Sequence, residues 1–135
     1  MKDQELIELA RRAREKAYVP YSGFPVGAAL VAEDGTVFTG CNIENASYGL
    51  ALCAERTAIF KMASEGYHAI SAIAVIAETD GPVSPCGACR QVMAEFAGNG
   101  VRVILTNLKG DVQVTTVGDL LPGAFRPGDL PPPRG

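Results

Sequence analysis

The sequence lacks any apolar run that approaches the roughly 20 residues needed to span a membrane. Its first residues, MKDQELIELARRAREK, are strongly charged and carry the apolar spacing of a helix, unlike a secretory signal peptide. The same segment contains several acidic residues, which are rare in transit peptides. These absences predict a cytoplasmic protein with no membrane partner.

Extended basic clusters are also missing. The net charge is −3, and the one tight basic group comprises Arg11, Arg12, Arg14 and Lys16. Acidic residues alternate with this group, a pattern typical of the solvated face of a helix. Binding to nucleic acid depends on clustered Lys and Arg that neutralise phosphates. The composition therefore predicts that nucleic acid is not a partner.

Internal repeats and long linkers are absent too. The chain has 135 residues, of which 47% are hydrophobic and 20% charged, as expected for a globular protein with a substantial core. This length fits one domain and leaves little room for a second. We therefore predict a single catalytic domain over residues 1–135, in which the Pro- and Gly-rich residues 127–135 form a flexible tail.

Apolar spacing and turn residues predict the order helix, hairpin, helix, strand, helix, strand, strand. The predicted elements are a helix over 3–17, strands over 26–32 and 37–41, a helix over 50–65, a strand over 70–77, a helix from Pro85 to about Gly98, and strands over 101–106 and 112–117. An Asp-Gly turn joins the first two strands. Ser84 is the expected N-cap before Pro85. Strand–helix–strand units imply some parallel pairing, so we expect an α/β fold with a mixed sheet of about five strands.

Histidine is scarce, whereas cysteine is not. The one histidine, His68, follows a predicted helix end and is expected to be exposed rather than a ligand. The four cysteines are Cys41, Cys53, Cys86 and Cys89. In a cytosolic chain of this size, metal binding or redox chemistry is more common than a disulfide framework.

The pair Cys86 and Cys89 opens a predicted helix with C-x-x-C spacing, which suits either a redox dithiol or half of a zinc site. Cys53 favours zinc, because three thiolates leave the fourth tetrahedral position open to water, as in a catalytic site. Cys41 is expected to be a buried strand cysteine. If Cys41 were instead a fourth ligand, the zinc would be closed and merely structural.

Cys53 and Glu55 lie about 200° apart around an ideal helix, so no single helix face carries both. They can serve one site only if the tip of that helix points at the metal. We therefore expect both helix N-termini to converge on the zinc, where their partial positive charge stabilises thiolates. Arg56 lies on the side of Cys53 and can donate hydrogen bonds to the sulfurs, although an exposed surface arginine is the alternative.

The combination of C-x-E and a later P-C-x-x-C is the signature of zinc deaminases acting on bases. The chain resembles the small homotetrameric cytidine deaminases with a three-cysteine zinc site. The matching stretches are residues 21–28 (YSGFPVGA), 40–48 (GCNIENASY), 53–56 (CAER), 85–91 (PCGACRQ) and 120–125 (LLPGAF). They cover most of the chain in the family's order.

This resemblance implies a three-layer α/β/α sandwich that hydrolyses cytidine or 2′-deoxycytidine to the uridine product and ammonia, in pyrimidine salvage. It implies one Zn²⁺ per subunit, held by Cys53, Cys86 and Cys89, with Glu55 as the proton carrier. It further implies a homotetramer whose active sites are shared between subunits.

The resemblance also implies a set of substrate-binding residues: Phe24, Asn42, Glu44, Tyr48, Ala54, Ser84 and Phe125. Asn42 and Glu44 are expected to hold the ribose hydroxyls, and the Ser84 carbonyl to accept from the amine at C4. Phe125 is expected to reach a neighbouring subunit's site. From the residues alone, Asn42 and Glu44 also fit a solvated turn, Phe24 a core position, and Phe125 a contact within its own domain.

Two other functions fit the same residues. A deaminase of a modified cytosine nucleoside, such as blasticidin S, would share the zinc motifs. A structural zinc or thiol-redox domain would need the cysteines but not Glu55.

Overall fold

The computed structural model describes residues 1–132, and its centre is a five-stranded sheet in the order β2-β1-β3-β4-β5. The strands are β1 (Val26–Ala32), β2 (Val37–Cys41), β3 (Ile70–Ala77), β4 (Arg102–Asn107) and β5 (Val112–Thr116). Strands β3 and β4 run parallel, and the other neighbours are antiparallel. The predicted mixed sheet is thus confirmed, including the hairpin formed by the first two strands.

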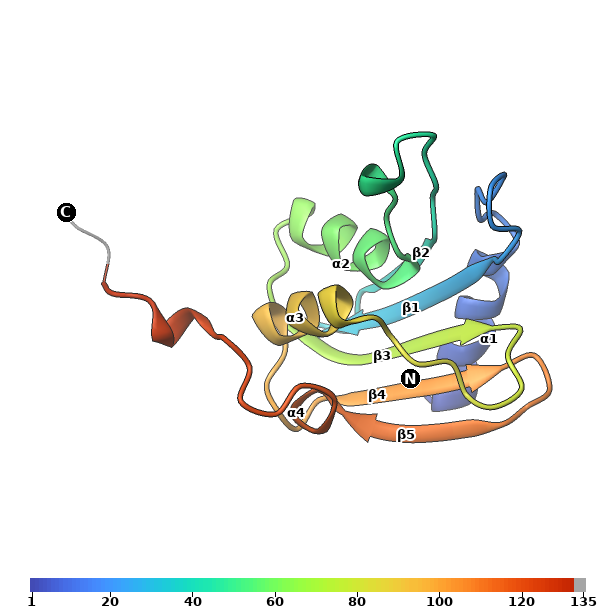
Figure 1. Ribbon diagram of the computed structural model, residues 1–135. Helices are drawn as coiled ribbons and strands as arrows, with labels where there is room; N and C mark the ends of the chain where they lie inside the picture. Colours follow the sequence, from blue (N-terminus) through green and yellow to red (C-terminus); the bar gives the residue numbers. More distant parts are fainter. Residues whose placement is uncertain (133–135) are drawn as a thin grey trace.

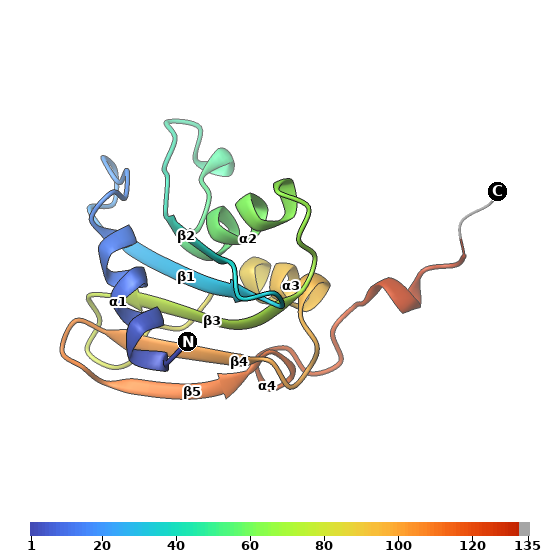
Figure 2. The ribbon, with the colours of Figure 1, turned by 180° about the vertical axis from the view of Figure 1, so that it is seen from behind.

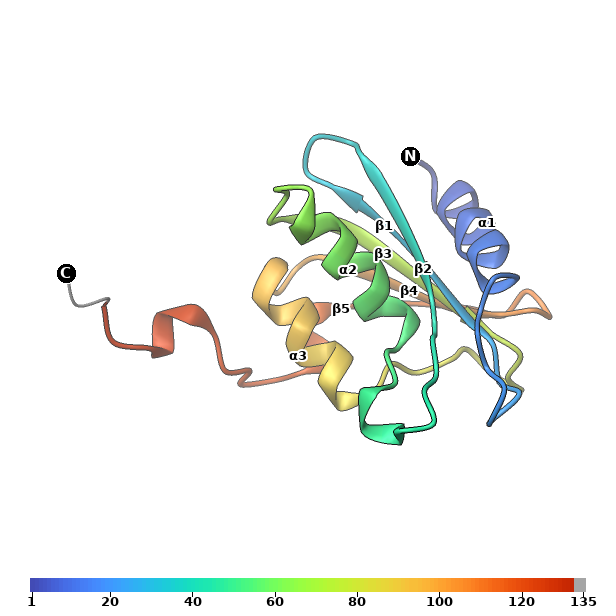
Figure 3. The same cartoon turned by 90° about the horizontal axis from the view of Figure 1, so that it is seen from above.

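Helices cover the two faces of this sheet and make three layers. The first face carries α1 (Asp3–Arg14), and the opposite face carries α2 (Ala54–Ser64) and α3 (Gly87–Phe96). Figure 3 shows α1 on one side of the strands and the other two helices on the far side. Seen from behind in Figure 2, α1 crosses β1 and β3. The expected α/β/α sandwich is confirmed.

The alternation of side chains along the strands divides the core between the two faces. On β1, Ala28 and Leu30 pack with the α2 and α3 side, whereas Ala29 packs with α1. Successive residues of a strand point to opposite faces, so an apolar run such as residues 26–32 belongs to a strand that is covered on both sides. All three residues are fully buried.

Two glycines allow helices to approach the sheet closely. A Cβ atom on Gly27 would lie 2.0 Å from the Ala10 carbonyl oxygen of α1. A Cβ atom on Gly40 would lie 2.6 Å from both the Ala54 oxygen and the Ala58 nitrogen of α2. Because these are backbone atoms, any side chain at either position would push a whole helix away from the sheet.

Both helices that carry cysteines begin later than predicted. Helix α2 begins at Ala54, and a separate 3-10 turn occupies Tyr48–Leu50. Helix α3 begins at Gly87, so Cys86 is its N-cap and the prediction of Ser84 in that position was wrong. The Cys86 sulfur accepts a hydrogen bond from the Cys89 N–H. Sulfur has therefore taken the capping role expected of the serine hydroxyl.

The C-terminal segment leaves the sheet beside α3 and extends away from the body of the molecule (Figure 1). It follows α4 (Val117–Leu120) and contains a 3-10 turn at Pro127–Asp129. This turn lies in the segment for which a flexible tail was predicted, and residues 133–135 of that segment lie outside the described range. Among residues 1–132, no helix is long and apolar enough to cross a membrane.

Candidate metal centre and adjoining cavity

Three sulfur atoms from two helix starts meet at one point. The Sγ atoms of Cys53, Cys86 and Cys89 all lie within 4.8 Å of one another, and those of Cys53 and Cys86 are 3.7 Å apart. Two sulfurs bound to tetrahedral zinc at about 2.3 Å would be separated by roughly 3.8 Å. The observed spacing therefore fits zinc, with three coordination positions supplied by protein.

The expected convergence of two helix tips explains this geometry. Cys53 is the N-cap of α2, and Cys86 is the N-cap of α3. Unpaired N–H groups at each helix start carry partial positive charge, which favours anionic sulfur. Because Cys53 precedes the helix, Glu55 lies in the first turn of α2 and belongs to the same end.

Arg56 lies beside the sulfurs, as the sequence predicted. Its Nη2 donates to Cys53 Sγ at 3.3 Å, and the residue is only partly exposed. Its Nε is buried and has no hydrogen-bond partner among the described residues. The positive guanidinium offsets the negative charge that three thiolates bring to a divalent cation.

The thiols influence one another strongly. A hydrogen bond with Cys89, followed by one from Arg56, lowers the pKa of Cys53 to about 5, although burial acts in the opposite direction. The same contact with Cys53, together with burial, raises the pKa of Cys89. Of these two thiols, that of Cys53 therefore ionises more readily. Zinc binds thiolates, so metal binding releases the protons of all three cysteines.

Glu55 is buried beside this cluster, with 3% of its surface exposed. Burial is the main cause that raises the pKa of its carboxyl group, and the charge of Cys53 adds to the effect. A carboxyl group of this kind takes up and releases a proton closer to neutral pH than an exposed one.

A cavity of about 220 Å³ opens directly onto the cluster. Its lining includes Cys53, Cys86 and Glu55. It also includes most of the residues predicted to bind substrate, namely Phe24, Asn42, Ala54 and Ser84. Sequence reasoning missed three further lining residues, Val26, Val75 and Val83. Val26 and Val75 belong to neighbouring strands, and Val83 to the loop that follows β3. Their apolar character suits one face of a planar base.

The side chain of Asn42 forms hydrogen bonds with the backbone at the start of β1, beside the cavity. Its Oδ1 accepts from the Val26 N–H at 2.8 Å, and its Nδ2 donates to the Phe24 carbonyl at 2.9 Å. Phe24 itself is 41% exposed at the mouth of the cavity rather than part of the core. The amide of Asn42 retains a second N–H and a second lone pair for a ligand.

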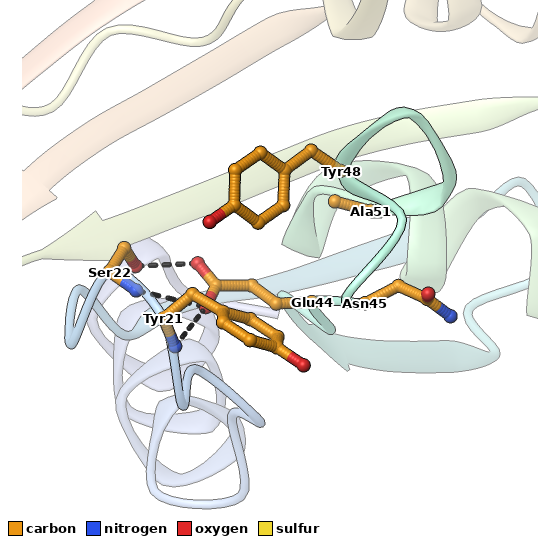
Figure 4. A pocket seen from close by; sticks show the side chains of 6 residues that line it. All are labelled: Tyr21, Ser22, Glu44, Asn45, Tyr48 and Ala51. Carbon is orange, nitrogen blue, oxygen red and sulfur yellow. Dashed lines mark hydrogen bonds between the residues drawn. The ribbon is translucent and has the colours of Figure 1, made fainter.

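Glu44 and Tyr48 lie in a neighbouring hollow, shown in Figure 4. The Glu44 Oε1 accepts from the N–H groups of Tyr21 and Ser22 at 3.0 and 3.1 Å, and its Oε2 accepts from the Ser22 hydroxyl at 2.5 Å. Led by the Ser22 hydroxyl, these bonds lower the pKa of Glu44. The sequence did not indicate that this carboxylate also holds the 21–22 turn.

Two remaining residues stand apart from the cavity. Phe125 is 55% exposed, and its backbone carbonyl accepts from Gln91 Nε2 of α3 at 2.7 Å. Cys41 ends β2, is half-buried rather than buried, and is not part of the sulfur cluster. A four-sulfur centre of the closed, structural kind is therefore not formed by the described cysteines.

Comparisons with known proteins agree with this geometry. The family model of the cytidine and deoxycytidylate deaminase zinc-binding region matches residues 1–105, which include the three clustered cysteines. A cytidine deaminase of Sporosarcina psychrophila is 62% identical over 127 residues, covering 94% of this chain and 93% of its own. One from Mycobacterium tuberculosis is 44% identical over 125 residues, covering 93% of this chain and 90% of its own. The crystal structure of cytidine deaminase from Burkholderia pseudomallei superposes with a TM-score of 0.90 at 61% identity, over 93% of this chain and 100% of that one.

Proposed function

The chain belongs to the cytidine and deoxycytidylate deaminase family, and we propose that it hydrolyses cytidine and 2′-deoxycytidine to uridine and 2′-deoxyuridine with release of ammonia. The observation that carries this proposal is the open three-sulfur centre, which shares its cavity with a buried carboxyl group. Zinc held by Cys53, Cys86 and Cys89 would lower the pKa of a water molecule, so that hydroxide is available near neutral pH.

Glu55 is the proposed proton carrier. Its carboxylate takes a proton from the attacking water and delivers it to ring N3 of the base. It then moves the remaining proton from the hydroxyl formed at C4 to the amine that leaves, so that C4 becomes a carbonyl. Water adds to C4 and the C4–N bond breaks, so the products are the uridine compound and ammonia. The raised pKa of Glu55 supports this role, because the group must both gain and lose a proton in each turnover.

The cavity walls suit a planar base. Phe24 and the three valines offer apolar contact, and the Ala54 N–H is one of the unpaired donors of the first turn of α2. We propose that the Ser84 carbonyl accepts from the amine at C4. We further propose that Asn42 binds a ribose hydroxyl with the hydrogen-bonding capacity that its own contacts leave free.

Glu44 favours an unphosphorylated substrate. Its lowered pKa keeps the carboxylate charged, and a carboxylate accepts from a hydroxyl but repels a phosphate. One acceptor site on Oε2 remains for a ribose hydroxyl beyond the bond to Ser22. We therefore propose a nucleoside rather than a nucleotide as substrate, with Tyr48 bordering the sugar.

Residues 1–135 are proposed to act as one catalytic domain in a homotetramer with shared active sites. The support is the exposure of Tyr48 at 75% and of Phe125 at 55%, since large apolar side chains in such positions commonly mark interfaces. Sedimentation velocity should give four times the mass of the chain, and a monomer would refute the assembly. The three thiols that the zinc requires support a reducing, cytoplasmic location. We further propose that deamination of the free nucleoside serves pyrimidine salvage.

The deciding experiment is Glu55→Gln. We expect turnover, followed by the loss of cytidine absorbance, to fall by about 10²- to 10⁴-fold, as is typical when a general acid–base group is removed. Zinc content and circular dichroism should be retained. Glu65→Gln, which removes a carboxylate from the exposed end of the same helix, is the matched control and should turn over normally. Normal turnover in the Glu55 variant would refute the mechanism, and blasticidin S as the better substrate would refute the assignment of cytidine.

A further inference from the structure

One wall of the cavity is a short segment that the backbone hydrogen bonds of the following helix do not hold. Ser84 and Pro85 precede α3, whose first backbone hydrogen bond runs from the Arg90 N–H to the Cys86 carbonyl. Pro85 has no N–H to donate, and its carbonyl lies before the helical ladder. Some other group must therefore fix this dipeptide, because the Ser84 carbonyl is proposed to meet the substrate.

Arg90 supplies the missing contacts. Its Nε donates to the Pro85 carbonyl at 2.9 Å, and its Nη2 donates to the Ser84 hydroxyl at 2.7 Å. Within residues 1–132, every hydrogen bond formed by Ser84 and Pro85 goes to this one guanidinium. The Ser84 carbonyl is left without a partner there, although it lies between two groups that are both held.

We propose that Arg90 is a positioning residue, which holds the Ser84 carbonyl in the place where it accepts from the amine at C4. The role rests on the proposed deamination and acts through Ser84, since Arg90 is not among the residues that line the cavity. Hydrogen bonds from a charged donor are stronger than those between neutral groups, so this dipeptide is held firmly.

The third arm of the guanidinium extends the arrangement to the C-terminal segment. Arg90 Nη1 donates to the Leu120 carbonyl at 2.8 Å, at the end of α4. The next residue of the helix, Gln91, donates to the Phe125 carbonyl at 2.7 Å. One turn of α3 therefore holds both the wall of the cavity and the segment that presents Phe125, so that each is placed relative to the other.

Arginine suits this position better than lysine. Three acceptors lie around Arg90 in different directions, and a planar guanidinium offers five N–H donors in a rigid fork. A lysine carries its donors at one point and cannot serve all three carbonyl and hydroxyl groups together. Arg90→Lys should therefore keep the charge but lose part of the positioning.

The test separates positioning of this carbonyl from a general effect on folding. Cytidine has an amine at C4 that donates to Ser84, whereas the product uridine has a carbonyl there and cannot donate. In zinc-loaded Arg90→Ala we expect kcat/KM for cytidine to fall by about 10- to 100-fold, the range expected for a misplaced contact. The inhibition constant of uridine should change by less than about threefold, because no hydrogen bond to that carbonyl is lost.

Conservative replacement and chemical rescue complete the design. Arg90→Lys should lose less activity than Arg90→Ala, and guanidinium ion at non-denaturing concentration should restore part of the activity of the alanine variant. Arg102→Ala, which removes an arginine that pairs with Asp3 of α1, is the matched control and should keep the wild-type ratio of the two constants. If Arg90→Ala does not fold, Arg90→Lys is judged by the same ratio.

Equal losses for cytidine and uridine would show that Arg90 only supports the fold, and unchanged kcat/KM would show that it has no role. Either result overturns the proposal. A wild-type protein that does not deaminate cytidine would instead refute the proposed function from which the role follows.

Discussion

Gly40→Ala adds one methyl group, which should disturb the metal centre by displacing the start of helix α2. The added Cβ would lie 2.6 Å from backbone atoms of Ala54 and Ala58, whereas ordinary van der Waals contact begins at 3.4 Å. Helix α2 would therefore have to retreat from β2 by about 0.8 Å. Backbone atoms cannot rotate away as a flexible side chain can, so the whole start of the helix must move.

The movement should affect both stability and the site. Overpacking of this kind typically costs about 1–3 kcal/mol, which corresponds to a decrease in Tm of roughly 3–12 °C for a chain of this length. Metal–ligand distances tolerate only about ±0.2 Å. A shift of Cys53 relative to Cys86 by several times that amount should weaken zinc binding, and kcat/KM for cytidine should fall by about 10- to 100-fold.

Gly27→Ala is the matched control, because it pushes a helix away from the opposite face of the same sheet. Its Cβ would lie 2.0 Å from the Ala10 oxygen of α1, a worse clash than at Gly40. We expect this variant to lose at least as much stability while its zinc content and its turnover per folded molecule stay near wild type. Urea unfolding, zinc titration with a colorimetric chelator and cytidine kinetics give the three quantities. Wild-type zinc affinity and turnover in Gly40→Ala would refute the reasoning.

Three further predictions concern individual side chains. Arg56→Gln should lower zinc retention or turnover, because it removes the guanidinium that donates to Cys53 Sγ. Zinc content after dialysis against a chelator and cytidine kinetics measure these two quantities. Normal values of both would contradict the prediction. In the zinc-free protein, Glu55→Gln should become progressively more stable than wild type as pH rises above about 4, the ordinary pKa of an unfolded glutamate. Burial raises the pKa of Glu55 in the folded state, so the unfolded state releases its proton first and ionisation costs the wild type stability. Urea unfolding in chelator tests this, and a difference independent of pH would contradict it. Asn107→Leu should cost about 2–4 kcal/mol, because this buried amide donates to the carbonyls of Thr79 and Asp80 in the loop that leads to the cavity. Denaturant unfolding measures this loss, and a cost below about 1 kcal/mol would show that the loop is held by other contacts.

The local sequence misled in one informative place. Ser84-Pro85 is a common way to begin a helix, yet α3 begins two residues after the proline. The reason is tertiary, because Arg90 binds both residues from within the helix and holds them outside it. The start of α2 was missed in a similar way, since residues 50–53 have helical composition but the Leu52 N–H pairs with the Ile43 carbonyl.

The sequence by itself determined the order of the elements, the mixed sheet and the group of residues that make the centre. Hydrophobic periodicity and turn residues are local signals, and the C-x-E and C-x-x-C spacings require two helix starts to converge on one metal. The contact of Arg56 with Cys53 also followed from the sequence, since residues three apart on a helix are neighbours.

Tertiary structure alone decided how these residues are shared between sites. It placed Glu44 in a separate hollow where the 21–22 turn occupies most of its carboxylate, and it left Cys41 half-buried rather than buried. These outcomes depend on the register of β1 against β2 and on how closely Gly40 lets α2 approach. Such distances arise from packing between segments far apart in the chain, and local sequence patterns do not encode them.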